Sequence, residues 1–324
     1  MKSIEHFLYF LQFHPAIAGL KAPRIILGFD TPYGQRVDQI LDENARQSSS
    51  YRFQCYRLTT KNANAMNEAI AHDSDLFILF YDAFTRETVS PEGPECIHRI
   101  RNTIRKHWQK SVLIKDYGGH FDEAFGTDPQ RIIGLNKALI DIATQSKTLR
   151  YTNDWGSDAT ARLRGTDQSW TNVDGCGNPD IVPGEIATHS ETIDGLFYFT
   201  GVFLSTIPFA IKHGEVRKPL ILHIENSRIL DFHTHDSELQ ADFAKYLAKN
   251  DSNQVVEELG IGTNEGIKNL YSTNAGFEER HCGLHLGLGG GKPGSHHMDL
   301  IFTSGQLYFD DQCVFDGQYH VGGV

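Results

Sequence analysis

Histidines and carboxylates are concentrated near the end of the chain, in residues 281–299. If the segment around His297 and Asp299 is a strand, these residues are i and i+2 and face the same side, where they can hold one metal ion together. A third ligand such as His285, brought near by the glycine-rich segment, would complete a set of two histidines and one carboxylate. That set suits iron(II) with open coordination positions, or the zinc or manganese of hydrolases. The alternative is a glycine-rich surface loop with solvated histidines.

Two acidic motifs lie upstream of this stretch. Glu185 follows a Pro-Gly turn, and Glu258 lies beside Gly260 and Gly262, which permit close approach of the backbone. A carboxylate among Leu, Ile and Gly is costly to bury unless it is paired or binds a metal. Either glutamate alone is ordinarily a salt-bridged acid, but with the histidines they form a candidate metal set. His189, four residues after Glu185, is a candidate acid or base, with an exposed loop histidine as the alternative.

The order of four motifs resembles the thermophilic-type metalloaminopeptidases, the leucyl aminopeptidase-like family of aminopeptidase T and aminopeptidase S. The likeness extends over about residues 149–302. The motifs are Gly-Glu-Ile-Ala-Thr at 184–188, Glu-Leu-Gly-Ile-Gly-Thr-Asn at 258–264, Gly-Leu-His-Leu-Gly-Leu-Gly at 283–289 and His-Met-Asp-Leu-Ile at 297–301. The same fold includes an offshoot, the 2,5-dihydroxypyridine dioxygenases, which keep one iron on two histidines and one aspartate.

The resemblance implies metal ligands at Glu185, Glu258, His285, His297 and Asp299. In the aminopeptidase interpretation, one or two divalent ions (zinc, manganese or cobalt) activate a water that attacks a peptide or amino-acid-like amide, and Glu185 or Glu258 is the general base. In the dioxygenase interpretation, His285, His297 and Asp299 hold one iron(II), which takes oxygen and a dihydroxylated ring. A third interpretation is a peptide-binding relative with little turnover in a biosynthetic pathway. We expect the hydrolase, because both glutamates are present.

Three further features of the sequence bear on which residues form the metal site. The peptidases carry a tyrosine seven residues after the histidine that matches His285, and this position is Lys292 here. The pair His281 and Cys282 could bind zinc with His285, but the chain has no second cysteine pair to complete such a site. The His-Thr-His run at 233–235 resembles a metal-hydrolase motif without its other ligands, and we expect a polar turn before a helix.

The two halves of the chain differ in the elements that they predict. Apolar runs at 24–30, 51–58, 76–81 and 111–115 alternate with helical patterns at 35–47, 63–72, 95–107 and 129–146, which predicts a doubly wound parallel sheet. No GxGxxG or GxxxxGK[ST] motif accompanies it, so we do not expect a nucleotide site. Short strand patterns follow, with a hairpin expected at 300–309 around the turn at 303–305. We therefore predict an α/β, Rossmann-like domain at 1–148 and a strand-rich α+β metal-binding domain at 149–324.

The charge and the cysteine content indicate which partners and which cell compartment to expect. The net charge is −11, and residues 151–324 hold 24 acidic against 11 basic residues, which disfavours nucleic-acid binding. No apolar run is long enough to cross a membrane, the start lacks a secretory signal pattern, and the five cysteines are scattered. We expect a cytoplasmic protein with a small-molecule or peptide substrate. The family resemblance implies an oligomer, and we expect a homodimer.

Overall fold

A computed structural model describes residues 2–47, 51–83, 92–190, 192–207 and 209–321. The chain forms two compact units, Met1–Pro129 with Gly175–Pro183, and Gln130–Asp174 with Gly184–Val324. The sequence suggested a boundary at residue 148, but the helix expected at 129–146 belongs almost wholly to the second unit. The segment at 175–183 returns to the first unit.

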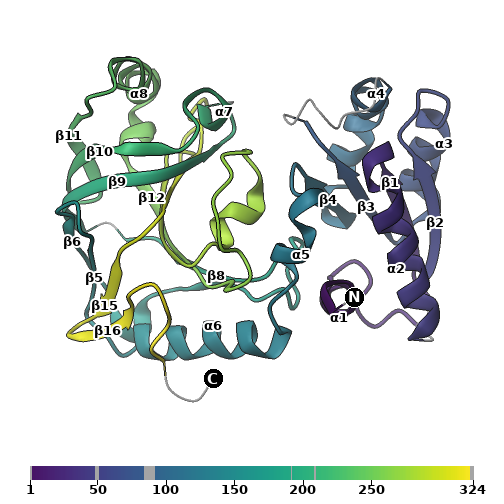
Figure 1. The fold of residues 1–324 in the computed structure, drawn as a ribbon, viewed down its shortest axis with the longest axis horizontal. Coiled ribbons are helices and arrows are strands. Elements are labelled where there is room, and N and C mark those ends of the chain that lie inside the picture. The colour runs from purple at the N-terminus through teal and green to yellow at the C-terminus, as the bar shows by residue number, and fades with distance from the viewer. Residues whose placement is uncertain (1, 48–50, 84–91, 191, 208, 322–324) are drawn as a thin grey trace. The chain divides into compact units, whose positions relative to one another are not determined.

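The first unit alternates strands and helices as its apolar pattern predicts (Figure 1). Its strands are β1 (Arg24–Phe29), β2 (Arg52–Arg57), β3 (Leu76–Tyr81) and β4 (Ser111–Lys115). Its α-helices are α1 (Lys2–Leu11), α2 (Gly34–Arg46), α3 (Ala63–Glu68), α4 (Gly93–Lys106) and α5 (Phe121–Ala124). Short 3-10 or π turns lie at Thr31–Tyr33, Ala69–Asp73, Trp108–Lys110 and Gly118–His120.

The four strands of the first unit form a parallel sheet in the order β2-β1-β3-β4 within the described residues. Strand β3 is apolar on both faces, as buried parallel strands are, and Phe77 and Leu79 pack with Ile26 against α3 and α4. The predicted α/β class of this half is therefore confirmed.

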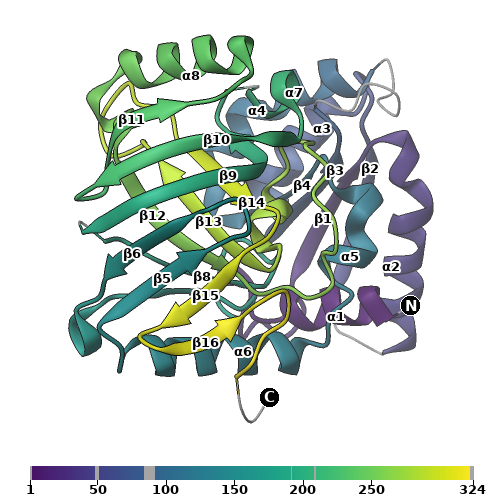
Figure 2. The same ribbon diagram turned by 60° about the vertical axis from the view of Figure 1, so that its left-hand side comes forward.

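The second unit is rich in strands (Figure 2). Its helices are α6 (Pro129–Ala143), α7 (Phe209–His213) and α8 (Ser237–Lys249), with 3-10 turns at Gly165–Asp167, Asp251–Gln254 and, labelled η7, Gly276–Arg280. Its strands are β5 (Thr148–Thr152), β6 (Asp158–Arg162), β7 (Thr171–Val173), β8 (Glu185–Thr188), β9 (Ile193–Ser205), β10 (Val216–Glu225), β11 (Arg228–His233), β12 (Val256–Gly262), β13 (Gly283–Leu288), β14 (Met298–Phe302), β15 (Gln306–Phe309) and β16 (Gln312–Phe315).

These strands form one large, curled antiparallel sheet. Its order within the described residues is β16-β15-β5-β6-β9-β14-β13-β12-β8-β7, with β10 joining β9 and β11. The core lies against the sheet and takes in Leu135 and Leu139 of α6 and Phe243 of α8. The strand-rich α+β class predicted for the second half is confirmed. Four neighbouring strands, β14, β13, β12 and β8, carry four of the five candidate metal ligands, and His297 directly precedes β14.

The hairpin expected at 300–309 does not form. Strand β14 pairs with β13 and β9, whereas β15 pairs with β5 and β16. The glycine turn thus leads the chain to a different part of the sheet, and the Tyr151 hydroxyl donates to the Ser304 carbonyl at 2.7 Å. A local turn signal could not show that the partner of β15 lies about 150 residues earlier in the chain.

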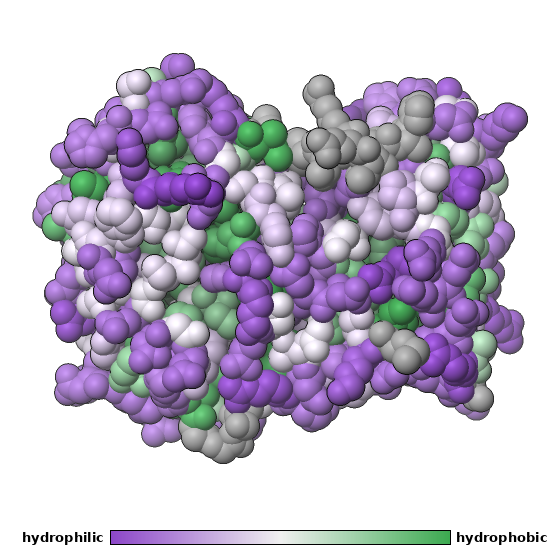
Figure 3. All heavy atoms as spheres, in the orientation of Figure 1, coloured by the Kyte–Doolittle hydropathy of each residue, from purple (hydrophilic) through white to green (hydrophobic). Residues whose placement is uncertain are grey.

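The face of the molecule in Figure 3 is mostly hydrophilic, with hydrophobic residues in small separate areas. The large apolar side chains that remain exposed include Leu20, Trp108, Trp155 and Leu230. In the described part of the chain, no helix has the length and apolar character needed to traverse a bilayer.

Candidate metal centre

The register of the antiparallel strands sets Glu258, Gly287 and Asp299 side by side. Gly287 of β13 is the partner of Glu258 on β12 and of Asp299 on β14. A Cβ at position 287 would lie 2.8 Å from Glu258 Cβ, 2.8 Å from His297 Cε1 and 3.1 Å from Asp299 Oδ1. Glycine is therefore required here, because any side chain would fill the space between the two carboxylates.

A second glycine makes room for His285. Gly260 of β12 is the cross-strand partner of His285, and a Cβ at position 260 would lie 1.9 Å from the imidazole Nε2. The ring therefore lies directly over the Gly260 backbone. On the other side of β12, Gly262 pairs with Glu185, the first residue of β8.

Helix α6 helps to fix Glu185 in this position. The amide of Asn136, which is fully buried, donates to the Glu185 carbonyl at 2.9 Å, and Thr263 donates to the same Asn136 side chain. The start of β8 is therefore held by a side-chain hydrogen bond as well as by its neighbouring strands.

The five predicted ligands come together as two groups, which we call the metal-type groups, that share one carboxylate. Glu185, Glu258 and His285 form one group, and Glu258, His297 and Asp299 form the other; within each, three ligand atoms lie within 4.8 Å of one another. Within these groups, the histidine and carboxylate atoms that pair lie between 2.8 and 4.0 Å apart. Ligand atoms of one zinc ion lie about 2.0–2.2 Å from the metal and thus roughly 3–3.5 Å from each other. The donor types and spacing therefore fit divalent ions.

The first group is buried and strongly coupled. His285 Nε2 lies 3.0 Å from Glu185 Oε1 and 3.7 Å from Glu258 Oε1. Burial acts to raise the pKa of Glu185, but Arg280 and His285 outweigh it and bring the value to about 2. Burial acts to lower the pKa of His285, but the two glutamates raise it well above its usual value.

The second group is more open to solvent. His297 Nε2 lies 2.8 Å from Asp299 Oδ1 and 4.0 Å from Glu258 Oε2. About a third of each of the His297 and Glu258 side chains is exposed. The hydrogen bond to Asp299 raises the pKa of His297 to about 9, against the effect of partial burial. Without a metal, this imidazole is therefore protonated at neutral pH.

Arg280 is a member of the centre that the sequence did not predict. It ends η7, and its guanidinium donates to Glu185 Oε2 and, at 2.9 Å, to Glu279. Burial and the nearby Asp299 carboxylate raise the pKa of Glu279 well above its usual value. The run Glu278-Glu279-Arg280 just before the histidine-rich stretch was the only signal in the sequence.

A pocket of about 400 Å³ adjoins both groups, because Glu185 and Glu258 line it together with His189. The Glu257 carbonyl accepts a hydrogen bond from His189 Nδ1 at 2.8 Å. Nδ1 therefore carries the proton in the neutral ring, which leaves Nε2 as the basic atom. The three residues proposed as catalytic thus line one cavity.

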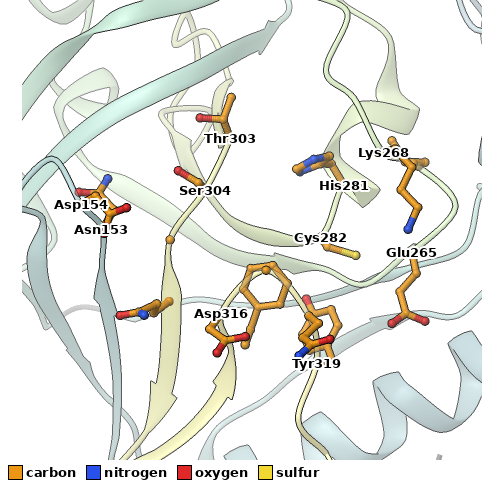
Figure 4. Close-up of a pocket in the computed structure, with 16 residues that line it drawn as sticks. Asn153, Asp154, Glu265, Lys268, His281, Cys282, Thr303, Ser304, Asp316 and Tyr319 are labelled. Carbon is orange, nitrogen blue, oxygen red and sulfur yellow. The ribbon is translucent and has the colours of Figure 1, made fainter.

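Residues of the alternative sites lie elsewhere. His281 and Cys282 line a different pocket of about 390 Å³ (Figure 4), and neither belongs to a metal-type group among the described residues. Burial lowers the pKa of His281 to about 4 and raises that of Cys282 to about 12. His233 and His235 stack edge to face with ring centroids 5.2 Å apart. Lys292 is exposed in the loop before His297.

Sequence comparisons find one partial match. A family model described as "Crocagin biosynthetic protein CgnE/B" matches residues 188–310. The matched segment contains Glu258, His285, His297 and Asp299 but not Glu185. A search of curated proteins finds no match.

Solved structures show the fold along nearly the whole chain. The 2,5-dihydroxypyridine dioxygenase from Pseudomonas putida KT2440 aligns with a TM-score of 0.60 and 15% identity, over 98% of this chain and 96% of its own. AmpT from Thermus thermophilus aligns with a TM-score of 0.60 and 12% identity, over 99% of both chains. At this identity the likeness establishes a common fold with two enzymes that differ from each other.

Proposed function

We propose that this protein is a metal-dependent hydrolase that cleaves an amide in a peptide or amino-acid-like molecule. One observation carries the proposal: two groups of His and carboxylate ligands share Glu258, next to a pocket that Glu258 itself lines. The fold shared with AmpT supports it. The biosynthetic description of the matching family model supports a substrate that is an intermediate of a biosynthetic pathway.

The exposure and contacts of each residue in the centre indicate its role in the reaction. A divalent ion bound by these ligands would supply a water of lowered pKa and polarise the amide carbonyl. Glu258 is partly exposed to the pocket and is our general base, a role that requires one of its carboxylate oxygens to remain free of the metal. Glu185 is a poor base, since its pKa is about 2, and instead holds His285 in place. His189 lines the same pocket, and its unprotonated Nε2 is suited to accept a proton during the reaction and pass it to the leaving amine.

A mononuclear iron(II) dioxygenase is the second candidate function. It is supported by a structural neighbour of equal TM-score, the 2,5-dihydroxypyridine dioxygenase. The ligand set that the sequence suggested for it, His285, His297 and Asp299, takes one histidine from each of the two groups. This division of the histidines is why we place the hydrolase first.

Metal analysis combined with two assays tests the choice. We would purify the protein without chelator under anaerobic conditions, measure bound metals, and assay both amino-acid amide hydrolysis and oxygen uptake with dihydroxylated rings. The hydrolase proposal expects a divalent metal and amide cleavage that is lost in Glu258→Ala. Iron with ring-dependent oxygen uptake would replace it with the dioxygenase. Tight binding of a peptide without turnover or metal would instead support a peptide-binding relative.

A further inference from the structure

A buried arginine forms an ion pair with Glu185, a carboxylate of the first metal-type group. The side chains of Arg280 and Glu185 are each only 5% exposed and form an ion pair. The Arg280 backbone is fixed as well, since its carbonyl accepts a hydrogen bond from Asn264 N at 2.9 Å. The guanidinium is thus a buried part of the centre that is held in place, rather than a mobile surface group.

The two groups differ in how far their carboxylates are already neutralised. Both oxygens of Glu185 have protein donors, since Oε2 accepts from Arg280 and Oε1 lies 3.0 Å from His285 Nε2. Among the described pairs inside the second group, His297 and Asp299, at 2.8 Å, are the pair within hydrogen-bond distance, and His297 Nδ1 also donates to the Gly289 carbonyl at 3.3 Å. An imidazole can release its proton to an incoming ion, but a guanidinium keeps its charge throughout the accessible pH range. Arg280 therefore opposes a second cation at Glu185 under all conditions.

We propose that Arg280 takes the place of one of two metal ions, so that this chain holds a single tightly bound divalent ion on Glu258, His297 and Asp299. Glu185 and His285 then form a protein-only ion-pair cluster with Arg280 next to that ion. The inference rests on the proposed function only in that the centre binds metal. The alternative is that Glu185 itself binds a metal ion and that Arg280 only orients this ligand.

Equilibrium titration with Zn²⁺ in competition with a chromophoric chelator tests the proposal. We expect one tight ion per wild-type chain, and in Arg280→Met a second ion bound at least tenfold more tightly than any second ion of the wild type. Mn²⁺ loading gives a second readout, because one ion per chain has an uncoupled EPR spectrum and two ions sharing Glu258 have a coupled one. The matched control is Arg131→Met, which removes another arginine–glutamate pair, with Glu265, and should leave the stoichiometry at one.

Removal of Arg280 leaves buried carboxylates unpaired and can unfold the chain. Two carboxylate variants keep the proposal testable in that case. Glu185→Gln should keep one ion with an affinity within threefold of the wild type, whereas Asp299→Asn should lose it. Two ions of similar affinity in the wild type would overturn this inference alone. Loss of the ion in Glu185→Gln, or in a folded Arg280→Met, would do the same. Absence of any bound ion in the wild type would overturn the proposed metal-dependent function as well.

Discussion

Gly287 lies directly across from Glu258, so close that a methyl group at position 287 would approach the Glu258 Cβ to 2.8 Å. Contacts this short do not occur between real carbon atoms, so a side chain here must displace Glu258, His297 or both. The missing side chain of Gly287 is thus as much a part of the centre as the ligands.

Gly287→Ala should therefore weaken metal binding without unfolding the second unit. We expect a loss of at least tenfold in Zn²⁺ affinity, since an ion tolerates only small changes in ligand spacing. Chelator competition measures the affinity, and circular dichroism checks the fold. Gly276→Ala is the control, because a Cβ there meets no atom within 4 Å. Equal affinities in the two variants would show that the space over Gly287 is not needed for the ion.

His189→Gln should lower amide hydrolysis while leaving the bound metal in place. Glutamine can still donate to the Glu257 carbonyl but offers no basic nitrogen to the pocket. Loss of a general acid or base costs roughly 10²–10⁴ in rate, which a hydrolysis assay of the metal-loaded variant measures. His296→Gln is the matched control, since His296 is outside both metal-type groups. Activity within threefold of the wild type would rule out the proposed role.

Metal affinity should rise with pH over the range in which His297 titrates. The pKa of His297 is raised to about 9 by its hydrogen bond to Asp299, so at pH 7 the ion must displace a proton. The apparent affinity should increase by up to about tenfold per pH unit from pH 7 and level off above pH 9. Calorimetric titration in buffers of different ionisation enthalpy would count the protons released. An affinity that is flat from pH 7 to 9 would contradict a protonated His297.

Tyr319→Phe should destabilise the second unit. The Tyr319 hydroxyl donates to the buried Gly262 carbonyl, next to the start of β8. Its loss removes a hydrogen bond to this buried carbonyl, at a cost of about 0.5–1.5 kcal/mol in unfolding free energy, which urea denaturation can measure. Tyr308→Phe removes a hydroxyl from a less buried hydrogen bond to Gln306 and should change stability by less than about 0.5 kcal/mol. Similar values for both variants would mean that the Gly262 carbonyl finds another donor.

Local patterns were enough to predict the four strands and three of the helices of the first unit, but not α1 or α5, and the pairing of His297 with Asp299. Parallel strands such as β3 are recognisable because both faces are apolar, and an i, i+2 spacing places two side chains on one face. The grouping of these two residues with Glu258, which lies about 40 positions earlier, came from the family resemblance rather than from spacing.

Long-range pairing set the limit of prediction. Arg280 contacts Glu185 across 95 residues of sequence, and no local pattern links the two. The same holds for β15, whose partner β5 could not be inferred from the turn at 303–305. Likewise, the sequence indicated only that Gly260 permits close approach of the backbone, and the cross-strand register shows which side chains Gly260 and Gly287 accommodate. Register is a property of paired strands, so a single strand cannot reveal it.

The antiparallel ladder also determines where this chain can change in length. One residue inserted within β13 would turn His285 into the core and bring Leu286 to the metal face. Residues 289–296 lie between β13 and the ligand His297, and the two strands are already fixed to each other and to their outer neighbours, so this segment can lengthen or shorten without moving Glu258 or Asp299. The residues around the metal can therefore change through this segment while the spacing of Glu258 and Asp299 stays the same.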